Sequence, residues 1–593
     1  LQENWKYLRL YDCDEHGETV LKVIQKEKLD FKVMMGVYIE AEMNNFGCPW
    51  GGGVYSEEQL SLNQKKDVLS VAIKNADIKQ GAELAAVLTV TPQQVKRWLV
   101  QAKPSGKVSK LVAQLNLSQK KLITLSAQIK EFTALATSQM IGVNKMDLWL
   151  THQDTQGYAG LDINHGQLDL KPIYRQATPV EQLSAILKWS DLGDAWLVES
   201  NQIKVKNTDA HGDAVLSLWL PKADLSATQM QLLASIYQGN LASVWRYVPW
   251  PSAGDDTLAW LKSALVSGNI ERGDFLYQGV LIDTPQRPPS TMQMHFSVSD
   301  GLLDYAPQWP RLKRLNADID IYNRRLTITA KNAQIYESIA REINAEILDL
   351  SEPKLRLKAG VDTTGDDLMR LFKETPLKEE TAHFADMIGI KGEIAGELEL
   401  QLPLSSATHE ELSVDVLAEL VGNPIVLRQA PEFDLWLSGG VNYKTGMGLT
   451  SLPLQGFLLT QPVNVKLQSV LNAGDIAAVQ IQANGQLAPI NLKPWLADLT
   501  QSMRGQTQYS TLLTIPMTND PVHIVLDSNL VGWQIDLPEP FQKVADKSLP
   551  VHYEMELQSP HKQTGYLVVG SALQSGFEVK NGLINRIDRK SVV

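Results

Sequence analysis

The stretch Glu397-Leu-Glu-Leu-Gln-Leu402 alternates strictly between a charged or polar residue and leucine. Successive side chains of a β-strand point to opposite faces of the sheet, so Leu398, Leu400 and Leu402 are predicted to share one apolar face. A second stretch, Val551-His-Tyr-Glu-Met-Glu-Leu557, has an apolar residue at every other position. It predicts a further apolar face made of Val551, Tyr553, Met555 and Leu557.

Short segments of this kind recur from about Val68 to about Arg586, with little else between them. A single enzyme core needs only a few such strands, so the recurrence favours an extended β structure. We therefore predict a mostly β fold, an elongated antiparallel β-sheet groove with short bracing helices. The helices are expected at Thr257–Val266, Asp366–Lys373 and Pro494–Met503, where apolar residues follow a helical period.

Composition limits the possible classes of protein. A chain of 593 residues is too long for one compact core, and 44% hydrophobic with 21% charged residues is typical of a folded protein. The net charge of −12 argues against a nucleic-acid partner. No window approaches the ~18 uncharged apolar residues of a membrane-spanning helix. The two cysteines, Cys13 and Cys48, could form a disulfide, although two buried thiols are favoured.

Residues 1–64 differ from the rest of the chain. Tyr7-Leu-Arg-Leu-Tyr11 predicts a strand, Glu18–Lys28 a helix, and the almost wholly apolar Phe31–Ile39 a strand buried on both faces. A helix start at Ser56-Glu-Glu follows a glycine-rich loop. This βαβα order predicts a partial (β/α) fragment ahead of the β region.

Three motifs in this segment resemble bacterial proteins of glycoside hydrolase family 17, which are β-glucan hydrolases. They are Tyr7-Leu-Arg-Leu-Tyr-Asp-Cys13, Phe31-Lys-Val-Met-Met-Gly36 and Ala41-Glu-Met-Asn-Asn-Phe-Gly-Cys-Pro-Trp50. The resemblance implies an eight-unit barrel, of which the segment holds about two units, and the family's catalytic motifs do not follow. We therefore interpret Glu40 and Glu42 as surface or loop acids and not as a catalytic pair.

Four motifs further along the chain resemble the YhdP branch of the AsmA-like family. They are Arg246-Tyr-Val-Pro249, the stretch from Trp260 to Gly279 that ends in Tyr277-Gln-Gly279, Leu303-Asp-Tyr-Ala-Pro-Gln-Trp-Pro310 and Trp533-Gln-Ile-Asp-Leu-Pro-Glu-Pro-Phe-Gln-Lys543. Their order and spacing fit over about residues 70–570. The resemblance implies a periplasmic protein of Gram-negative bacteria, anchored in the inner membrane by an N-terminal helix that this chain does not contain. It also implies transport of phospholipid towards the outer membrane along a β-sheet groove.

Matches to catalytic motifs are interpreted as coincidence. Ser118-Gln-Lys-Lys121 and Lys444-Thr-Gly446 resemble two elements of a penicillin-recognising site, but the third, Ser-Asp-Asn, is missing. The ten histidines are dispersed without zinc-ligand spacing. We predict no catalytic, cofactor-binding or metal-binding residues. The tryptophans of the β region could contact acyl chains, but core packing is favoured for Trp149, Trp189, Trp219 and Trp436.

The sequence divides into five predicted segments. Residues 1–64 form the (β/α) fragment, and residues 65–250, 251–403 and 404–587 form successive β regions. Residues 588–593 do not continue the strand pattern and are expected to be a non-native tail.

We interpret the chain as a non-enzymatic lipid carrier whose groove is lined by the seven alternating residues of the two opening stretches. Its predicted partners are phospholipid and the inner and outer membranes, with no nucleic acid and no cofactor, and its oligomeric state is open. Two alternatives remain, a β-glucan hydrolase remnant represented by residues 1–64 and a non-catalytic β scaffold with a filled core.

Overall fold

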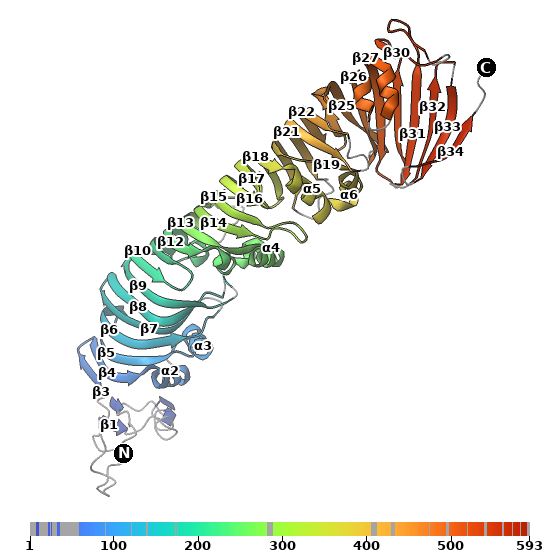
Figure 1. The fold of residues 1–593 in the computed structure, drawn as a ribbon. Coiled ribbons are helices and arrows are strands. Elements are labelled where there is room, and N and C mark those ends of the chain that lie inside the picture. The colour runs from blue at the N-terminus through green and yellow to red at the C-terminus, as the bar shows by residue number, and fades with distance from the viewer. Residues whose placement is uncertain are drawn as a thin grey trace, which may run out of the picture. The chain divides into compact units, whose positions relative to one another are not determined.

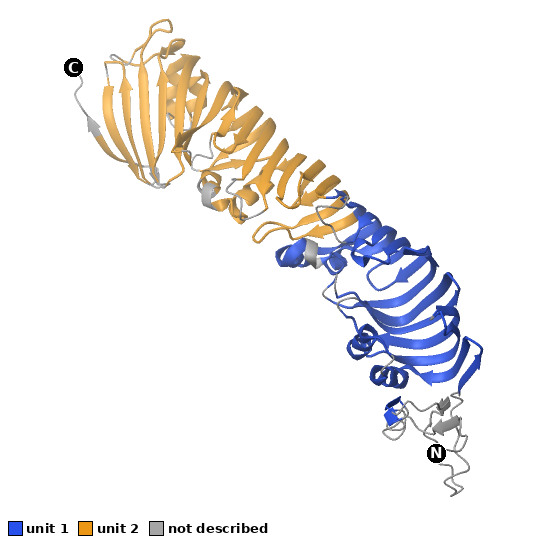
Figure 2. Ribbon diagram, turned by 180° about the vertical axis from the view of Figure 1, so that it is seen from behind, with its two compact units in different colours: residues 1–298, 320–323 blue, residues 299–319, 324–593 orange. Residues whose placement is uncertain are grey.

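In the computed structural model the chain forms two compact units, residues 1–298 with 320–323 and residues 299–319 with 324–593 (Figure 2). Strands dominate each unit and pair antiparallel, and the helices are short (Figure 1). This confirms the predicted fold class. The five-segment division stays a prediction. The structure describes residues 59–589 with gaps of one to seven residues, and before them residues 7–10, 22–23, 25–26 and 32–35.

The sheet of unit 1 is a meander in which each strand from β3 to β13 pairs antiparallel with the next. Tight turns join several of these strands. Lys66 and Asp154 adopt positive φ angles of 54° in two of these turns, as hairpin turns demand. The strands are β3 (Gln59–Lys65), β4 (Val68–Asp77), β5 (Ser105–Asn116), β6 (Lys121–Ala134), β7 (Gly142–Gln153), β8 (Gln156–Asp169), β9 (Thr178–Asp191), β10 (Ala195–Lys206), β11 (His211–Pro221), β12 (Gln229–Asn240) and β13 (Leu265–Val280).

The helices α2, α3, η2 and α4 of unit 1 lie in the longer connections at one end of the strands, and η1 lies at the other end (Figure 1). The Asp77 carboxylate starts the first of them by accepting a hydrogen bond from the Gln80 backbone N–H at 3.1 Å. The helix predicted at Thr257–Val266 is part of α4, which ends at Ala264 because the chain there enters β13. The helices are α2 (Ile78–Val87), α3 (Gln93–Ala102), η1 (Leu225–Ala227), η2 (Leu241–Arg246) and α4 (Trp250–Ala264).

The sheet of unit 2 continues the same pattern. Each strand pairs antiparallel with a strand close to it in sequence, and a small separate sheet joins β27 to β30. Two further strands, β14 (Thr291–Leu303) and β15 (Leu312–Tyr322), contain the residues at which the chain passes from one unit to the other. The other strands are β16 (Arg325–Ile335), β17 (Ser338–Ile347), β18 (Lys354–Thr364), β19 (Ile388–Ile390), β20 (Glu393–Pro403), β21 (Ser413–Leu427), β22 (Leu435–Lys444), β23 (Gly448–Ser451), β24 (Leu454–Leu458), β25 (Gln461–Asn472), β26 (Asp475–Leu487), β27 (Met503–Gly505), β28 (Thr507–Pro516), β29 (Val522–Ser528), β30 (Trp533–Ile535), β31 (Val551–Ser559), β32 (Lys562–Val569), β33 (Leu573–Lys580) and β34 (Leu583–Arg589).

Unit 2 also has short helices between its strands. The helix predicted at Asp366–Lys373 is confirmed as α5 (Gly365–Glu374), and α6 (Lys378–Met387) follows it. Within the helix predicted at Pro494–Met503, the described residues Ala497–Ser502 form a 3-10 helix, and Met503 begins β27. Residues 494–496 lie outside the described part. The two 3-10 helices of this region are η3 (Pro489–Leu492) and η4 (Ala497–Ser502).

Two of the strands predicted near the N-terminus are present. β1 (Tyr7–Leu10) pairs in parallel with β2 (Lys32–Met35), as the βαβ order predicts. Glu40, Glu42 and both cysteines lie outside the described residues. The predicted segment boundary at residue 64 falls inside β3, and β34 includes the first two residues of the expected tail.

Candidate functional site

One face of the unit 1 sheet is apolar across all of its long strands. Side chains that pair across neighbouring strands lie on the same face, so the pairing register identifies that face directly. One row of pairs on the opposite face is polar: Ser70, Gln114, Thr124, Gln153, Gln156 and Ser190. The apolar face includes the row Ile73, Leu111, Ala127, Leu150, Ala159 and Leu187, and, from β9 to β13, the row Ala185, Ile203, Ala214, Ala234 and Phe275.

The strands of unit 1 are bent, as the curvature of β4 to β9 in Figure 1 shows. The pairing skips or shifts by a residue near one end of most strands, and the residues at these bulges have left-handed backbone angles. A bulge bends its strand and increases the local twist, so a line of bulges curves the whole sheet. The residues with positive φ are Asn75, Gly106, Glu131, Lys145, His165, Gln238 and Gly268.

At the bulges, some backbone N–H groups do not pair with the neighbouring strand and instead donate hydrogen bonds to side chains. The Glu131 N–H donates to the Asp147 carboxylate at 2.9 Å, and the Lys145 N–H donates to the Thr133 hydroxyl at 3.1 Å. Lys130 forms an ion pair with Asp147 at 2.7 Å. The bulges are therefore stable features of the sheet, because the released amides keep hydrogen-bond partners.

The structure places Leu398, Leu400 and Leu402 on one face of β20. Leu400 pairs with Leu357 of β18 and with Val414 of β21, so apolar side chains flank it on both sides. All three leucines are half-buried, whereas Glu397, Glu399 and Gln401, on the opposite face, are exposed. The predicted alternation is present, and the role of these residues in lining a groove stays a prediction.

Val551, Tyr553, Met555 and Leu557 likewise share one face of β31 and are half-buried. The Tyr553 ring stacks on Phe577 with the centroids 5.7 Å apart, and its hydroxyl lies 3.0 Å from the Met555 sulfur. Burial raises the pKa of Tyr553 above its ordinary value. Phe577 lies across Gly565, where a Cβ atom would come within 2.1 Å of the ring. This glycine lets an aromatic side chain lie flat on the face.

The faces of β20 and β31 meet in one hydrophobic cluster of unit 2. Ile394, which alternates with Leu398 along β20, belongs to this cluster together with Val522, which pairs with Leu557 of β31. Leu368 of α5 and Phe384 of α6 pack against the same cluster. The two helices therefore cover part of the apolar face, while the leucines of β20 stay partly accessible.

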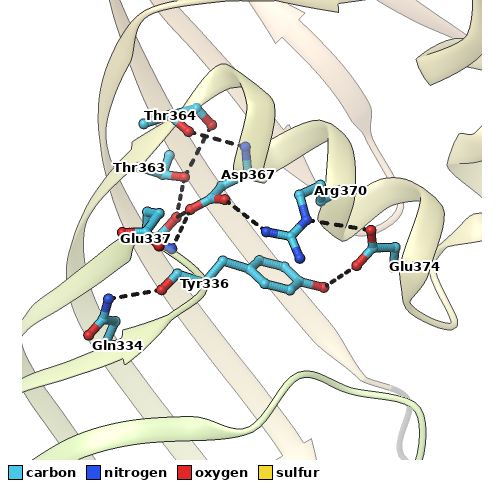
Figure 3. A network of polar contacts seen from close by, with 9 residues as sticks. Gln334, Tyr336, Glu337, Thr363, Thr364, Asp367, Arg370 and Glu374 are labelled. Carbon is cyan, nitrogen blue, oxygen red and sulfur yellow. Dashed lines mark hydrogen bonds and ion pairs between the residues drawn. The ribbon is translucent and has the colours of Figure 1, made fainter.

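A polar network fixes α5 to the hairpin between β16 and β17 (Figure 3). The buried Asp367 carboxylate accepts hydrogen bonds at 2.8 Å from the Glu337 N–H and from the Ser338 hydroxyl. The Arg370 guanidinium stacks on the Tyr336 ring at 3.8 Å, and Tyr336 has a positive φ of 52°. These contacts hold the helix without occupying the apolar face.

The motif Arg246-Tyr-Val-Pro249 has a similar structural role in unit 1. The Asp209 carboxylate, in the turn between β10 and β11, accepts hydrogen bonds from Ser243 at 2.8 Å, Arg246 at 2.9 Å and the Tyr247 hydroxyl at 2.9 Å. Burial and the hydrogen bond to Asp209 raise the pKa of Tyr247. These hydrogen bonds fix η2 to the turn between β10 and β11, and we call Asp209, Arg246 and Tyr247 together the latch.

The tryptophans differ from the expectation. Core packing is wrong for Trp149 and Trp436, whose residues are 40% and 43% exposed. Trp189 lies on the apolar face and lines a hollow in unit 1. Sequence alternation could have assigned its face, because Trp189 follows Leu183, Ala185 and Leu187 at every second position.

A hollow of about 850 Å³ with a mixed polar and apolar lining lies in unit 2, and side chains opposite the apolar face form much of this lining. The only ion pair along its paired row joins His552 to Asp527 at 2.7 Å. Within the described part of the chain, no group of three or more His, Cys, Asp and Glu side chains could hold a metal ion. The row of side chains in the lining is Asn464, Asn484, Ser510, Asp527, His552 and Val568.

Comparison with known proteins agrees with the apolar faces. A sequence model of the YhdP protein family matches residues 51–593. The chain belongs to the YhdP family. It is 21% identical over 532 residues to the intermembrane phospholipid transporter YhdP of Escherichia coli strain K12. That alignment covers 86% of this chain and 41% of the relative, so the chain spans about two fifths of the relative's length. No solved structure matches the chain.

Membership of the YhdP family confirms the resemblance seen in the sequence motifs. The family match begins at residue 51, so it includes the end of the segment that resembles glycoside hydrolase family 17. That second resemblance stays a prediction for residues 1–50. Among the helices of the described residues, none combines the length and the apolar character needed to cross a bilayer.

Proposed function

We propose that this chain carries phospholipid between the inner and outer membranes of a Gram-negative cell, with its β-sheet in the periplasm. The observation that carries the proposal is the apolar face. Cross-strand rows of leucine, isoleucine, valine and alanine run through each unit, and several of their larger side chains, such as Ile73, Leu111 and Leu400, are only half-buried. A lipid can lie against such a face while its headgroup stays in water.

The physical benefit of this face follows from the cost of exposing an acyl chain to water. That cost is about 0.8 kcal/mol for each CH₂ group, so a chain of ~16 carbons faces about 13 kcal/mol. Half-buried leucines remove much of this cost by covering one side of the chain. Because the rows are similarly apolar, no position on the face binds the lipid much more tightly than its neighbours, and the lipid can move from strand to strand.

The relative from E. coli supports this proposal, since its name describes transport of phospholipid between membranes. The transfer needs no bond-breaking chemistry, so we infer a protein that is not an enzyme. The hydrolase alternative is not favoured, because the family match covers residues 51–593 and its relative is a transporter. A scaffold with a filled core would bury the leucines of β20, which are instead half-exposed.

The test is site-specific crosslinking. A photoreactive p-benzoylphenylalanine replaces Leu400 or Tyr553 on the apolar face, or their neighbours Gln401 and Glu554 on the opposite face. After expression and illumination in Gram-negative cells, mass spectrometry identifies any phospholipid attached to the purified protein. We expect adducts at Leu400 and Tyr553 and background at the two controls. Equal yields on both faces, or none at all, would contradict the proposal.

A further inference from the structure

A shallow hollow of about 330 Å³ lies on the unit 1 sheet at the strand ends opposite α2 and α3, and only apolar residues line it. Its volume lies within the ~300–1,000 Å³ range of small-molecule sites. Three of its walls come from the ends of β9, β10 and β11, and Leu225 of η1 overhangs the opening with 64% of its surface exposed. The lining residues are Trp189, Trp196, Val198, Leu220 and Leu225.

The strand residues that line this hollow lie on the apolar face, close to the ends of β9, β10 and β11. Val198 pairs with Trp189, and Trp196 pairs with Leu220, so both pairs lie on the same face as the rows described above. Trp189 is held rigidly. Its indole N–H donates to His152 at 3.2 Å, and the ring lies across Gly157, where a Cβ atom would come within 2.2 Å. The wall is therefore preformed.

Two oppositely charged side chains, Lys222 and Asp191, lie beside this hollow, and Lys121 adds a further positive charge that acts on Asp191. The Lys222 ammonium lies 2.5 Å from the Asp191 carboxylate and 4.9 Å from the centroid of the Trp196 ring. It also donates to the Gly193 carbonyl at 2.9 Å, and the Lys222 backbone N–H is fixed by the Asp194 carbonyl at 2.8 Å. Both charged side chains remain partly exposed, at 35% and 25%.

We propose that the hollow and the two charged side chains beside it form a binding site for one zwitterionic phospholipid. An acyl segment would lie in the tryptophan-lined hollow, and the headgroup would contact Lys222 and Asp191. The proposal rests on the function proposed above and adds a place and a headgroup class to it. The headgroup phosphate takes the Lys222 ammonium, and the headgroup ammonium takes the Asp191 carboxylate. Tryptophan suits the boundary between apolar chain and polar headgroup because its ring is apolar and its N–H is polar.

Charge complementarity selects the zwitterion over other lipids. An anionic headgroup would gain Lys222 but would face Asp191, and an uncharged headgroup would leave the ion pair unused. A surface ion pair contributes little to stability, so exchanging it for two contacts with the headgroup costs little. The headgroup ammonium would also lie near the Trp196 ring, which attracts cations.

The experiment places p-benzoylphenylalanine at Leu220, which lines the hollow, or at Trp219, the preceding residue of β11 on the opposite face. The purified full chain is mixed with vesicles containing phosphatidylethanolamine, phosphatidylglycerol or diacylglycerol with identical acyl chains. We expect at least about fivefold more adduct with phosphatidylethanolamine than with either other lipid at Leu220, and background at Trp219. The preference should fall several-fold in Lys222→Gln, and Asp191→Asn should raise the yield with phosphatidylglycerol.

A third crosslinker position, Leu400, separates the two proposals. Lipid captured at Leu400 but not at Leu220 would overturn the binding site and leave the transport function standing. No lipid at either position would overturn the transport function itself. Equal capture of the three lipids at Leu220, a preference for phosphatidylglycerol, or capture of a protein there would each overturn the assignment of a zwitterionic lipid. Unchanged selectivity in Lys222→Gln would do the same.

Discussion

Leu400→Asp tests whether the apolar face of β20 is open to solvent and is used by lipid. Leu400 is half-buried between Leu357 and Val414, and no cation is paired with it across the strands. The new carboxylate would therefore have water on one side and apolar side chains on the others. We expect the variant to fold and to lose lipid.

The loss of folding stability and the loss of lipid occupancy can be estimated separately. Fully burying a leucine is worth about 1.5–3 kcal/mol, so the half-buried Leu400 contributes about 1–1.5 kcal/mol. Partial desolvation of the carboxylate adds about 1 kcal/mol, which gives a loss of about 2–2.5 kcal/mol in the free energy of unfolding. A bound acyl chain, by contrast, would cover the carboxylate and remove its remaining water, so lipid binding would carry an additional desolvation cost. A penalty of about 2–3 kcal/mol there lowers lipid occupancy about 30- to 140-fold.

The assay compares wild type, Leu400→Asp and Gln401→Asp, each with p-benzoylphenylalanine at Leu398. Gln401→Asp is the matched control because it adds the same charge one residue away on the exposed face. Lipid adducts are quantified by mass spectrometry, and the melting temperature is followed by circular dichroism. Unfolding of Leu400→Asp at growth temperature would indicate a sealed core and favour the scaffold alternative. Undiminished lipid in the folded variant would refute the reasoning about the face.

Four further outcomes are expected. Removing residues 1–56 keeps β3 paired with β4 and should change the melting temperature by less than about 2 °C, whereas a chain that starts at Asp67 loses β3 and should melt lower. Asp367→Ala leaves the Glu337 N–H and the Ser338 hydroxyl without their buried acceptor, so urea unfolding should show a loss of about 2–4 kcal/mol, against almost none for the exposed Asp366→Ala. The hydrogen bond with Asp527 raises the pKa of His552 above its ordinary value of about 6.5, so the pair should stabilise the fold fully below that pH and lose its effect as pH rises through the folded pKa. Melting curves from pH 5 to 9 should show this decline in wild type and not in His552→Gln. Incubation with β-1,3-glucan should release no reducing sugar above background; a reproducible release abolished by a Glu40 or Glu42 substitution would restore the hydrolase alternative.

Strand alternation was readable from sequence because it depends only on residue identity at every second position. Leu398, Leu400 and Leu402 share a face in the structure for the same reason that they alternate in the chain. The helix α5 was also readable, because Thr364 caps its first turn and its apolar residues follow one side. These features depend on residues that are close together in the chain, so the sequence alone predicts them.

The curvature of the sheet could not be read in this way. Glu131 and Lys145 adopt left-handed angles at bulges, and neither residue type favours that conformation. The bulges exist because a side chain on the next strand receives the freed amide, as Asp147 does for Glu131. A pairing between residues of separate strands leaves no periodic signal in either strand. The helices α2 and α3 were missed because the β pattern on both sides was extended across them.

The motif Arg246–Pro249 lies in a connection between strands and not on the apolar face, and the chemistry of the two places explains why this motif is recognisable. A face that holds any acyl segment needs only apolar side chains, and leucine, isoleucine, valine and alanine can replace one another there at modest cost. A latch such as Asp209 with Arg246 and Tyr247 needs particular donors and an acceptor at fixed distances. The apolar face should therefore tolerate substitution better than the hydrogen-bonded group of Asp209, Arg246 and Tyr247. A chain with 21% identity to its relative can then keep both the fold and an apolar face suited to lipid.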